Sequence, residues 1–81
     1  MNDCEAMLKS YGLHALPPML TAQEACNLIV ARRRAMHPHY PMPAANGMCR
    51  AMRALGFEPA GKVRSGAQVF FNPHHGNGPV I

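Results

Sequence analysis

Prolines are the feature that most constrains what this chain can fold into. They occur as the pair Pro17 and Pro18, and again as Pro38, Pro41 and Pro43 within six residues. Each proline fixes its own φ and lacks a backbone N–H donor, so neither cluster can lie inside a helix. The 81 residues are therefore divided into short elements. A single domain of this size buries only about 60 to 65% of the surface that its unfolded chain exposes.

Two helices are marked by their ends. The first begins among acidic residues and closes on Gly12, a residue suited to the position after a helix, which predicts a helix over 3–11. The second is preceded by Thr21, with Glu24 three residues later. This spacing is that of a capping box, in which each residue satisfies a backbone amide of the other. The sequence predicts a second helix from residue 22 to about residue 35.

A third helix follows the second proline cluster. It begins at Pro43, which suits the first helical position, or has Asn46 as its N-cap. It ends before Gly56, and its one-turn spacing of Met48 and Met52 is typical of core residues.

The pattern then changes from helical to alternating in "KVRSGAQVF". A three-residue turn at 65–67, which we prefer, sets Val63 opposite Val69 with both facing inward. A two-residue turn would instead set Val63 against Gln68. The alternation predicts a β-hairpin in either register.

The predicted fold class is mainly α (α+β), with three helices followed by a C-terminal two-stranded β-hairpin. The proline-containing segments between the helices are expected to be extended connectors. Residues 1–73 form the predicted single domain. Residues 74–81 are expected to be a flexible tail, because the last ten residues hold two prolines and two glycines and show no periodicity.

Charge is distributed unevenly along the chain. Residues 1–24 carry one lysine against three acids, whereas residues 25–81 carry seven basic side chains against Glu58 alone. The formal net charge of +4 is thus concentrated downstream. This asymmetry indicates association with a polyanion and does not identify a fold.

Several functional classes lack their motifs. With four acids, no paired carboxylates and no glycine-rich phosphate loop, we expect neither an enzyme nor a cofactor. The three cysteines are odd in number and widely spaced, so we expect buried thiols without a disulfide framework. The histidines lack zinc-ligand spacing, and no metal is expected. No apolar run of about 18 residues and no secretory signal are present, which favours a cytoplasmic protein without a membrane segment.

The stretch "MCRAMRALGFEPAGKVRSGAQVFF" carries a resemblance to a known superfamily. Three helices followed by a hairpin with a basic tip resemble a winged helix-turn-helix domain. The "L-x-x-G-F" after arginine-bearing helical turns is similar to the recognition-helix end of small phage and mobile-element winged domains, including those appended to replication primases. The likeness covers residues 21–71. The link over 36–43 is longer and richer in proline than the usual turn between the two helices.

The resemblance implies which residues would approach DNA. The helix ending at Leu55 corresponds to the recognition helix, and residues 62–69 correspond to the wing. The residues that it implies as contacts are Asn46, Arg50 and Arg53 on the helix and Lys62 and Arg64 on the wing. Arg33 is a sixth candidate, as a phosphate contact, which does not come from the resemblance. Arg33 is one of three consecutive arginines, of which at most one or two can face one surface.

The sequence therefore predicts a small non-enzymatic protein that binds double-stranded DNA, as a phage or mobile-element accessory or regulator. The alternative is a protein-binding module, or a phage-encoded inhibitor, that uses the same fold to block or recruit a host protein complex. The sequence is compatible with a monomer and with a homodimer.

Overall fold

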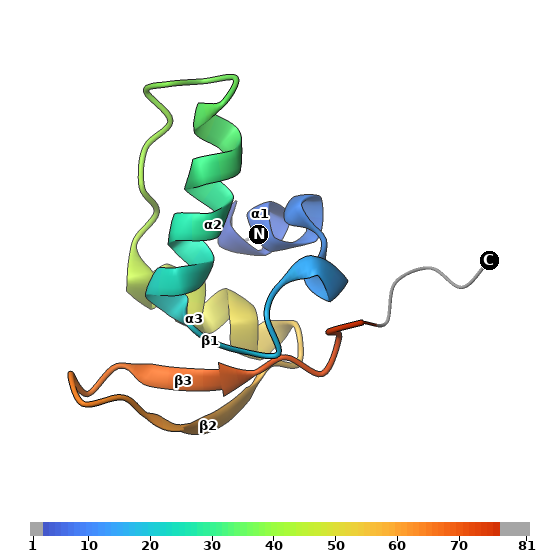
Figure 1. Cartoon of the computed structure of the whole chain (residues 1–81), viewed down its shortest axis with the longest axis vertical. Helices are drawn as coiled ribbons and strands as arrows, with labels where there is room; N and C mark the ends of the chain where they lie inside the picture. The colour runs from blue at the N-terminus through green and yellow to red at the C-terminus, as the bar shows by residue number, and fades with distance from the viewer. Residues whose placement is uncertain (1–2, 77–81) are drawn as a thin grey trace.

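A computed structural model describes residues 3–76 of the chain. Within these residues the chain forms three α-helices, one short 3-10 helix and one sheet of three strands (Figure 1). In chain order the elements are α1 (Asp3–Tyr11), η1 (Leu13–Ala15), β1 (Met19–Thr21), α2 (Ala22–Arg34), α3 (Ala45–Ala54), β2 (Glu58–Lys62) and β3 (Gln68–Phe71). The sheet lies at one end of the molecule, and α2 rises from it along the longest dimension. The α+β class and the three helices are as predicted.

The sheet has three strands where two were expected. Its order is β1-β3-β2, with both pairs antiparallel, so the last strand in sequence is the central one. The additional strand, β1, comes from the connector after Pro17 and Pro18, and Leu20 lies opposite Phe70. The connector is extended here, as predicted, but the prediction of only two strands was wrong, because the extended backbone that the prolines favour is also the conformation needed to pair with the open edge of β3.

The hairpin register also differs from the prediction. Lys62 pairs with Gln68, and the register shifts between Pro59 and Gly61, which leaves a five-residue connection over 63–67. The three-residue turn is therefore wrong, and so is the inward position of Val63, whose side chain is 43% exposed. The error lies in the turn itself: the Val63 amide donates to Ala67 O over 3.1 Å and the Gly66 amide donates to Val63 O over 2.8 Å, so Val63 belongs to the connection and not to the paired strand.

The start of α2 and the end of α3 follow their sequence signals, whereas the start of α3 does not. Thr21 and Glu24 form the predicted capping box, in which the Glu24 amide donates to Thr21 Oγ1 over 3.2 Å and the Thr21 amide donates to Glu24 Oε1 over 3.1 Å. Helix α3 begins at Ala45, with Ala44 as its N-cap and without a side-chain cap hydrogen bond. Both predicted starts, at Pro43 and with Asn46 as N-cap, were wrong, because the backbone is still extended at Ala44 and already helical at Asn46. It ends in a Schellman motif around Gly56, which adopts φ +91°, and the Phe57 amide donates to Met52 O over 2.9 Å.

One core joins the helices to the inner face of the sheet. Its largest fully buried side chains come from the three helices, from β1 and β3 and from the segment before β1. They include Leu8, Leu16, Leu20, Ile29, Met48, Met52 and Phe70. Met48 and Met52 are buried, as their spacing predicted. Helix α1 lies against α3, and its Leu8 side chain is completely buried. The core fixes α3 from behind and leaves its outer side in solvent.

The chain after β3 is tied back to the domain by Asn72. This buried amide donates to the carbonyl oxygens of Leu13 at 2.9 Å and Leu16 at 3.1 Å, and its own oxygen accepts from the His74 amide. The His74 and His75 rings also contact backbone carbonyls, so hydrogen bonds continue past residue 73, where the predicted domain ends. The rest of the expected flexible tail, residues 77–81, lies outside the described residues.

Candidate nucleic-acid interface

The outer side of α3 carries a polar and basic stripe. Asn46, Arg50 and Arg53 follow one another at intervals of four and three residues, which places them on one side of the helix. All three are exposed, and with Cys49 they line an open hollow of about 300 Å³. The other side of the helix is buried through Met48, Ala51 and Met52. The stripe is therefore held toward solvent by the packing of the opposite face.

A second hollow joins this stripe to the hairpin. It has a volume of about 330 Å³ and lies between the N-terminal ends of α2 and α3 and the start of β3, where it is lined by Gln23, Gln68 and other residues. Asn46 and Cys49 line both hollows. The surface therefore runs without interruption from the arginines of α3 to the hairpin.

The hairpin adds two cations next to this surface. Lys62 is paired with Gln68, and residues directly opposite in an antiparallel ladder project from the same face. Because Gln68 lines the groove beside α3, Lys62 lies on the groove side of the sheet. Arg64 is exposed in the connection between the strands. The structure thus places the α3 residues beside a groove whose other side includes Gln68, the strand partner of Lys62, with Arg64 in the connection between the strands.

None of these cations has an acidic partner in the part of the chain that the structure describes. Within residues 3–76, the side chains of Asn46, Arg50, Lys62 and Arg64 make no hydrogen bond or ion pair. The Arg53 guanidinium lies 5.9 Å from the centre of the Phe70 ring, which holds it over the sheet. Full positive charge is therefore available at this surface for an anionic partner.

Arg33 lies apart from the other five predicted residues. It is near the C-terminal end of α2, at the opposite end of that helix from the sheet (Figure 1). Its Nη2 donates to Ser10 Oγ over 3.1 Å, and its guanidinium lies 5.6 Å from the centre of the Tyr40 ring. The neighbouring arginines, Arg32 and Arg34, each donate to a backbone carbonyl. The predicted set therefore divides into five residues at one end and one at the other.

Three residues that line this surface were not among the contacts predicted from the sequence. Gln23 and Gln68 line the second hollow, between α2, α3 and β3, with their carboxamide side chains. Cys49 lies between Asn46 and Arg53 on α3. Cys49 could have been found from helical spacing alone, because it is one turn from both residues. Gln68 could not be placed without the correct hairpin register. Gln23 lies on α2, and its position depends on how the two helices pack.

The thiols differ in their surroundings. Burial raises the pKa of Cys26 to about 11, with smaller contributions from Cys4 and Cys49, and burial also raises the pKa of Cys4. Cys49 is half exposed, and no cysteine among the described residues is in a disulfide.

Alkylation of the native protein at pH 8 is therefore expected to modify Cys49 first. The reactive species is the thiolate, and a thiol of pKa about 11 is ionised to only about 0.1% at this pH. Mass spectrometry of the iodoacetamide-treated protein checks this, with the urea-unfolded protein as control, in which all three cysteines react. Equal rates at the three sites in the native protein would contradict the burial described here.

Other kinds of site are absent from the described part of the chain. Among residues 3–76, no group of three or more His, Cys, Asp or Glu side chains is placed to hold a metal ion. No described helix is long and apolar enough to cross a membrane. No protein-family model, curated protein or solved structure matches this chain.

Proposed function

We propose that this chain is a small, non-enzymatic, winged-helix-like protein that binds double-stranded DNA, with α3 as the recognition helix and the β2–β3 hairpin as the wing. The order of three helices followed by a hairpin with basic residues near its tip supports this proposal. The observation that carries it is the pair of adjoining hollows that leads from Arg50 and Arg53 to Gln68, the strand partner of Lys62, with no acidic partner for these cations among the described residues.

The dimensions of α3 suit the major groove of DNA. A groove about 12 Å wide admits one helix. Along the helix axis, Asn46 and Arg50 are separated by about 6 Å and Arg50 and Arg53 by about 4.5 Å, at a rise of about 1.5 Å per residue. These separations correspond to one or two base-pair steps of about 3.4 Å. An arginine side chain can form two hydrogen bonds with the edge of guanine, and an asparagine side chain can form two with the edge of adenine. Lys62 and Arg64 would neutralise phosphates.

The long link between α2 and α3 does not leave α3 unattached. The Cys26 thiol on α2 lies 3.8 Å from the Pro43 carbonyl oxygen, and Arg34 Nε donates to Tyr40 O over 3.0 Å. The link is therefore anchored to α2 at two points. This anchoring supports a fixed presentation of α3 despite the departure from the usual short turn.

One observation favours the second candidate function, a protein-binding module directed at a host protein complex. Met19 and Phe71 are paired across β1 and β3, so their side chains lie next to each other on the outer face of the sheet. They are 47% and 43% exposed. An apolar contact there would bind a protein partner with little dependence on salt, in contrast to DNA binding.

The salt dependence of duplex binding tests the proposed function. With four cations at the interface, the slope of log affinity against log salt is expected to be about −3 to −4, so that affinity falls about 100-fold between 50 and 200 mM salt. Lys62→Ala is expected to reduce the slope by about 1, because one phosphate contact is lost. Fluorescence anisotropy with a labelled duplex measures both values.

Lys9→Ala is the matched control for this experiment, because it removes one exposed positive charge from α1 and is expected to leave the slope unchanged. A wild-type affinity that is independent of salt would contradict DNA binding. In that case salt-resistant capture of a host protein would support the second candidate.

A further inference from the structure

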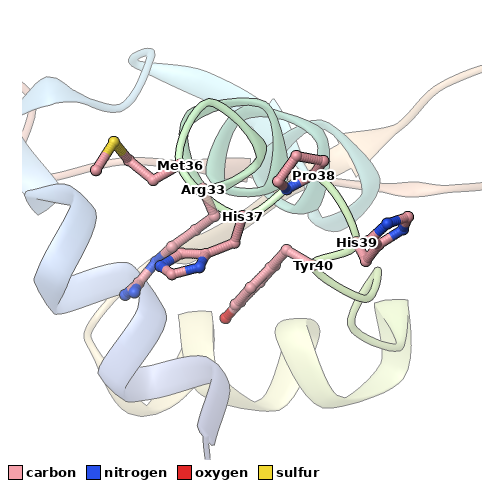
Figure 2. A pocket seen from close by; sticks show the side chains of 6 residues that line it. All are labelled: Arg33, Met36, His37, Pro38, His39 and Tyr40. Carbon is pink, nitrogen blue, oxygen red and sulfur yellow. The ribbon is translucent and has the colours of Figure 1, made fainter.

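A third hollow lies at the end of the molecule opposite the sheet. It has a volume of about 520 Å³ and is open to solvent, and it is formed by the last turn of α2 and the link that follows (Figure 2). Its lining residues are Arg33, Met36, His37, Pro38, His39 and Tyr40. In Figure 2 the side chains of Arg33, His37 and Tyr40 extend to the same side of the hollow, whereas His39 points away from them. The lining thus combines aromatic rings with a cation.

The hollow is preformed by backbone hydrogen bonds. The His37 amide donates to Arg33 O over 2.8 Å, and the Tyr40 amide donates to His37 O over 2.9 Å. Arg34 Nε donates to Tyr40 O from outside the lining, over 3.0 Å. Pro38 further restricts the link through its fixed φ. Carbonyl groups at the end of α2, which would otherwise repel an anion, are satisfied by the bond from His37 to Arg33 O and by a bond from the Ala35 amide to Arg32 O.

The side chains of the hollow retain unused binding capacity. The Arg33 guanidinium has five N–H donors and uses one on Ser10. Within residues 3–76, the Tyr40 hydroxyl has no hydrogen-bond partner. No carboxylate lines the hollow. Arg32 and Arg34 add positive charge next to it on α2.

We propose that this hollow binds one unpaired nucleotide, with the base stacked on Tyr40 beside His37 and the phosphate held by Arg33. A base supplies the flat π-face that aromatic side chains recognise, and a phosphate accepts the forked donors of arginine. A duplex keeps its bases inside the stack, so it would use only Arg33, and an acidic peptide would also leave the rings unused. The inference does not depend on α3, and it goes beyond the proposed duplex-binding function.

Nuclear magnetic resonance titration of the ¹⁵N-labelled full chain with deoxyadenosine monophosphate tests the proposal. We expect chemical-shift changes centred on the amides of residues 33–40. Inorganic phosphate and deoxyadenosine are each expected to bind at least about tenfold more weakly, because each lacks one of the two recognised groups. Shifts confined to α3 and the hairpin, or equal binding of inorganic phosphate, would overturn the proposal.

Substitutions separate the two recognised groups. Arg33→Ala is expected to weaken the nucleotide about tenfold by removing the phosphate contact, and Tyr40→Leu about fivefold or more by removing the stacking ring. Tyr40→Phe keeps the ring and is expected to bind within about twofold of wild type. Ser10→Ala removes the partner of Arg33 and checks whether loss of that contact alone has an effect. Binding unchanged by both Arg33→Ala and Tyr40→Leu would overturn the proposal.

A control and a second ligand complete the experiment. Lys9→Ala removes a positive charge outside the lining and is expected to leave nucleotide binding unchanged. An oligonucleotide of six deoxyadenosines distinguishes the two sources of the nucleotide. Tighter binding of the oligonucleotide at residues 33–40 assigns the hollow to single-stranded DNA, and equal binding per nucleotide assigns it to a free nucleotide. If duplex binding at α3 were disproved, this result would still stand, because nucleotide binding is followed through the amide signals of residues 33–40 and duplex binding through those of α3 and the hairpin.

Discussion

Changing Arg50 and Arg53 together to Glu is expected to lower the affinity for duplex DNA about 100-fold or more at low salt. Each arginine lost from a base or phosphate contact costs about 1 to 3 kcal/mol, and each new carboxylate repels the duplex. Both side chains are exposed on α3, and their replacement leaves the buried face of the helix intact. Fluorescence anisotropy with a labelled duplex at 50 mM salt measures the loss.

Two controls make this result specific to α3. Lys9→Glu reverses one charge on α1, away from the proposed interface, and so matches each of the two arginine substitutions in charge. It is expected to reduce the affinity for the duplex only a few-fold, through the lower net positive charge of the protein. Circular dichroism of each variant checks that the helices remain. Wild-type affinity in the double variant would exclude α3 from the interface and with it the recognition-helix proposal.

The second large effect concerns stability. Phe70→Ala is expected to lower the free energy of unfolding by about 3 to 5 kcal/mol, because a large ring is removed from a packed core. Phe70 is completely buried at the centre of the sheet, opposite Leu20 on one side and Pro59 on the other. A chain of this size has a total stability of about 4 to 12 kcal/mol. We therefore expect a large unfolded fraction at 37 °C, measurable by urea titration followed by circular dichroism.

The adjacent residue provides a matched control for this prediction. Phe71 is also a phenylalanine of β3, but it projects from the outer face and is 43% exposed. Phe71→Ala is expected to change the free energy of unfolding by less than about 1 kcal/mol. Equal destabilisation by the two substitutions would show that the two faces of the sheet are not distinguished as described.

The parts of the fold that were predictable depend on local signals. The capping box at Thr21 and Glu24 and the glycine after α3 act within a few residues, so the sequence marks the helix ends. Strand β1 could not be predicted from local signals, because Met19 and its partner Phe71 are far apart in the sequence. The hairpin register was missed because the hydrogen bonds that close the turn between Val63 and Ala67 are not specified by the alternating pattern.

The same distinction applies to the candidate site. The stripe of Asn46, Arg50 and Arg53 follows from helical periodicity, so the sequence was sufficient to place it on one side of α3. The position of Arg33 relative to that stripe depends on the path of the link between α2 and α3, which periodicity does not specify. Interpreting the proline-rich link only as a connector also left Tyr40 unrecognised as part of a hollow.

The central position of β3 determines when the sheet can form during synthesis. β1 and β2 flank β3, and both precede it in the chain, so neither has a partner until residues 68–71 have left the ribosome. At a translation rate of about 5 to 20 residues per second, β1 waits several seconds for its partner. In that interval the nascent chain can form its helices but exposes unpaired strand edges, so a pause in translation before β3 is expected to favour aggregation or chaperone binding.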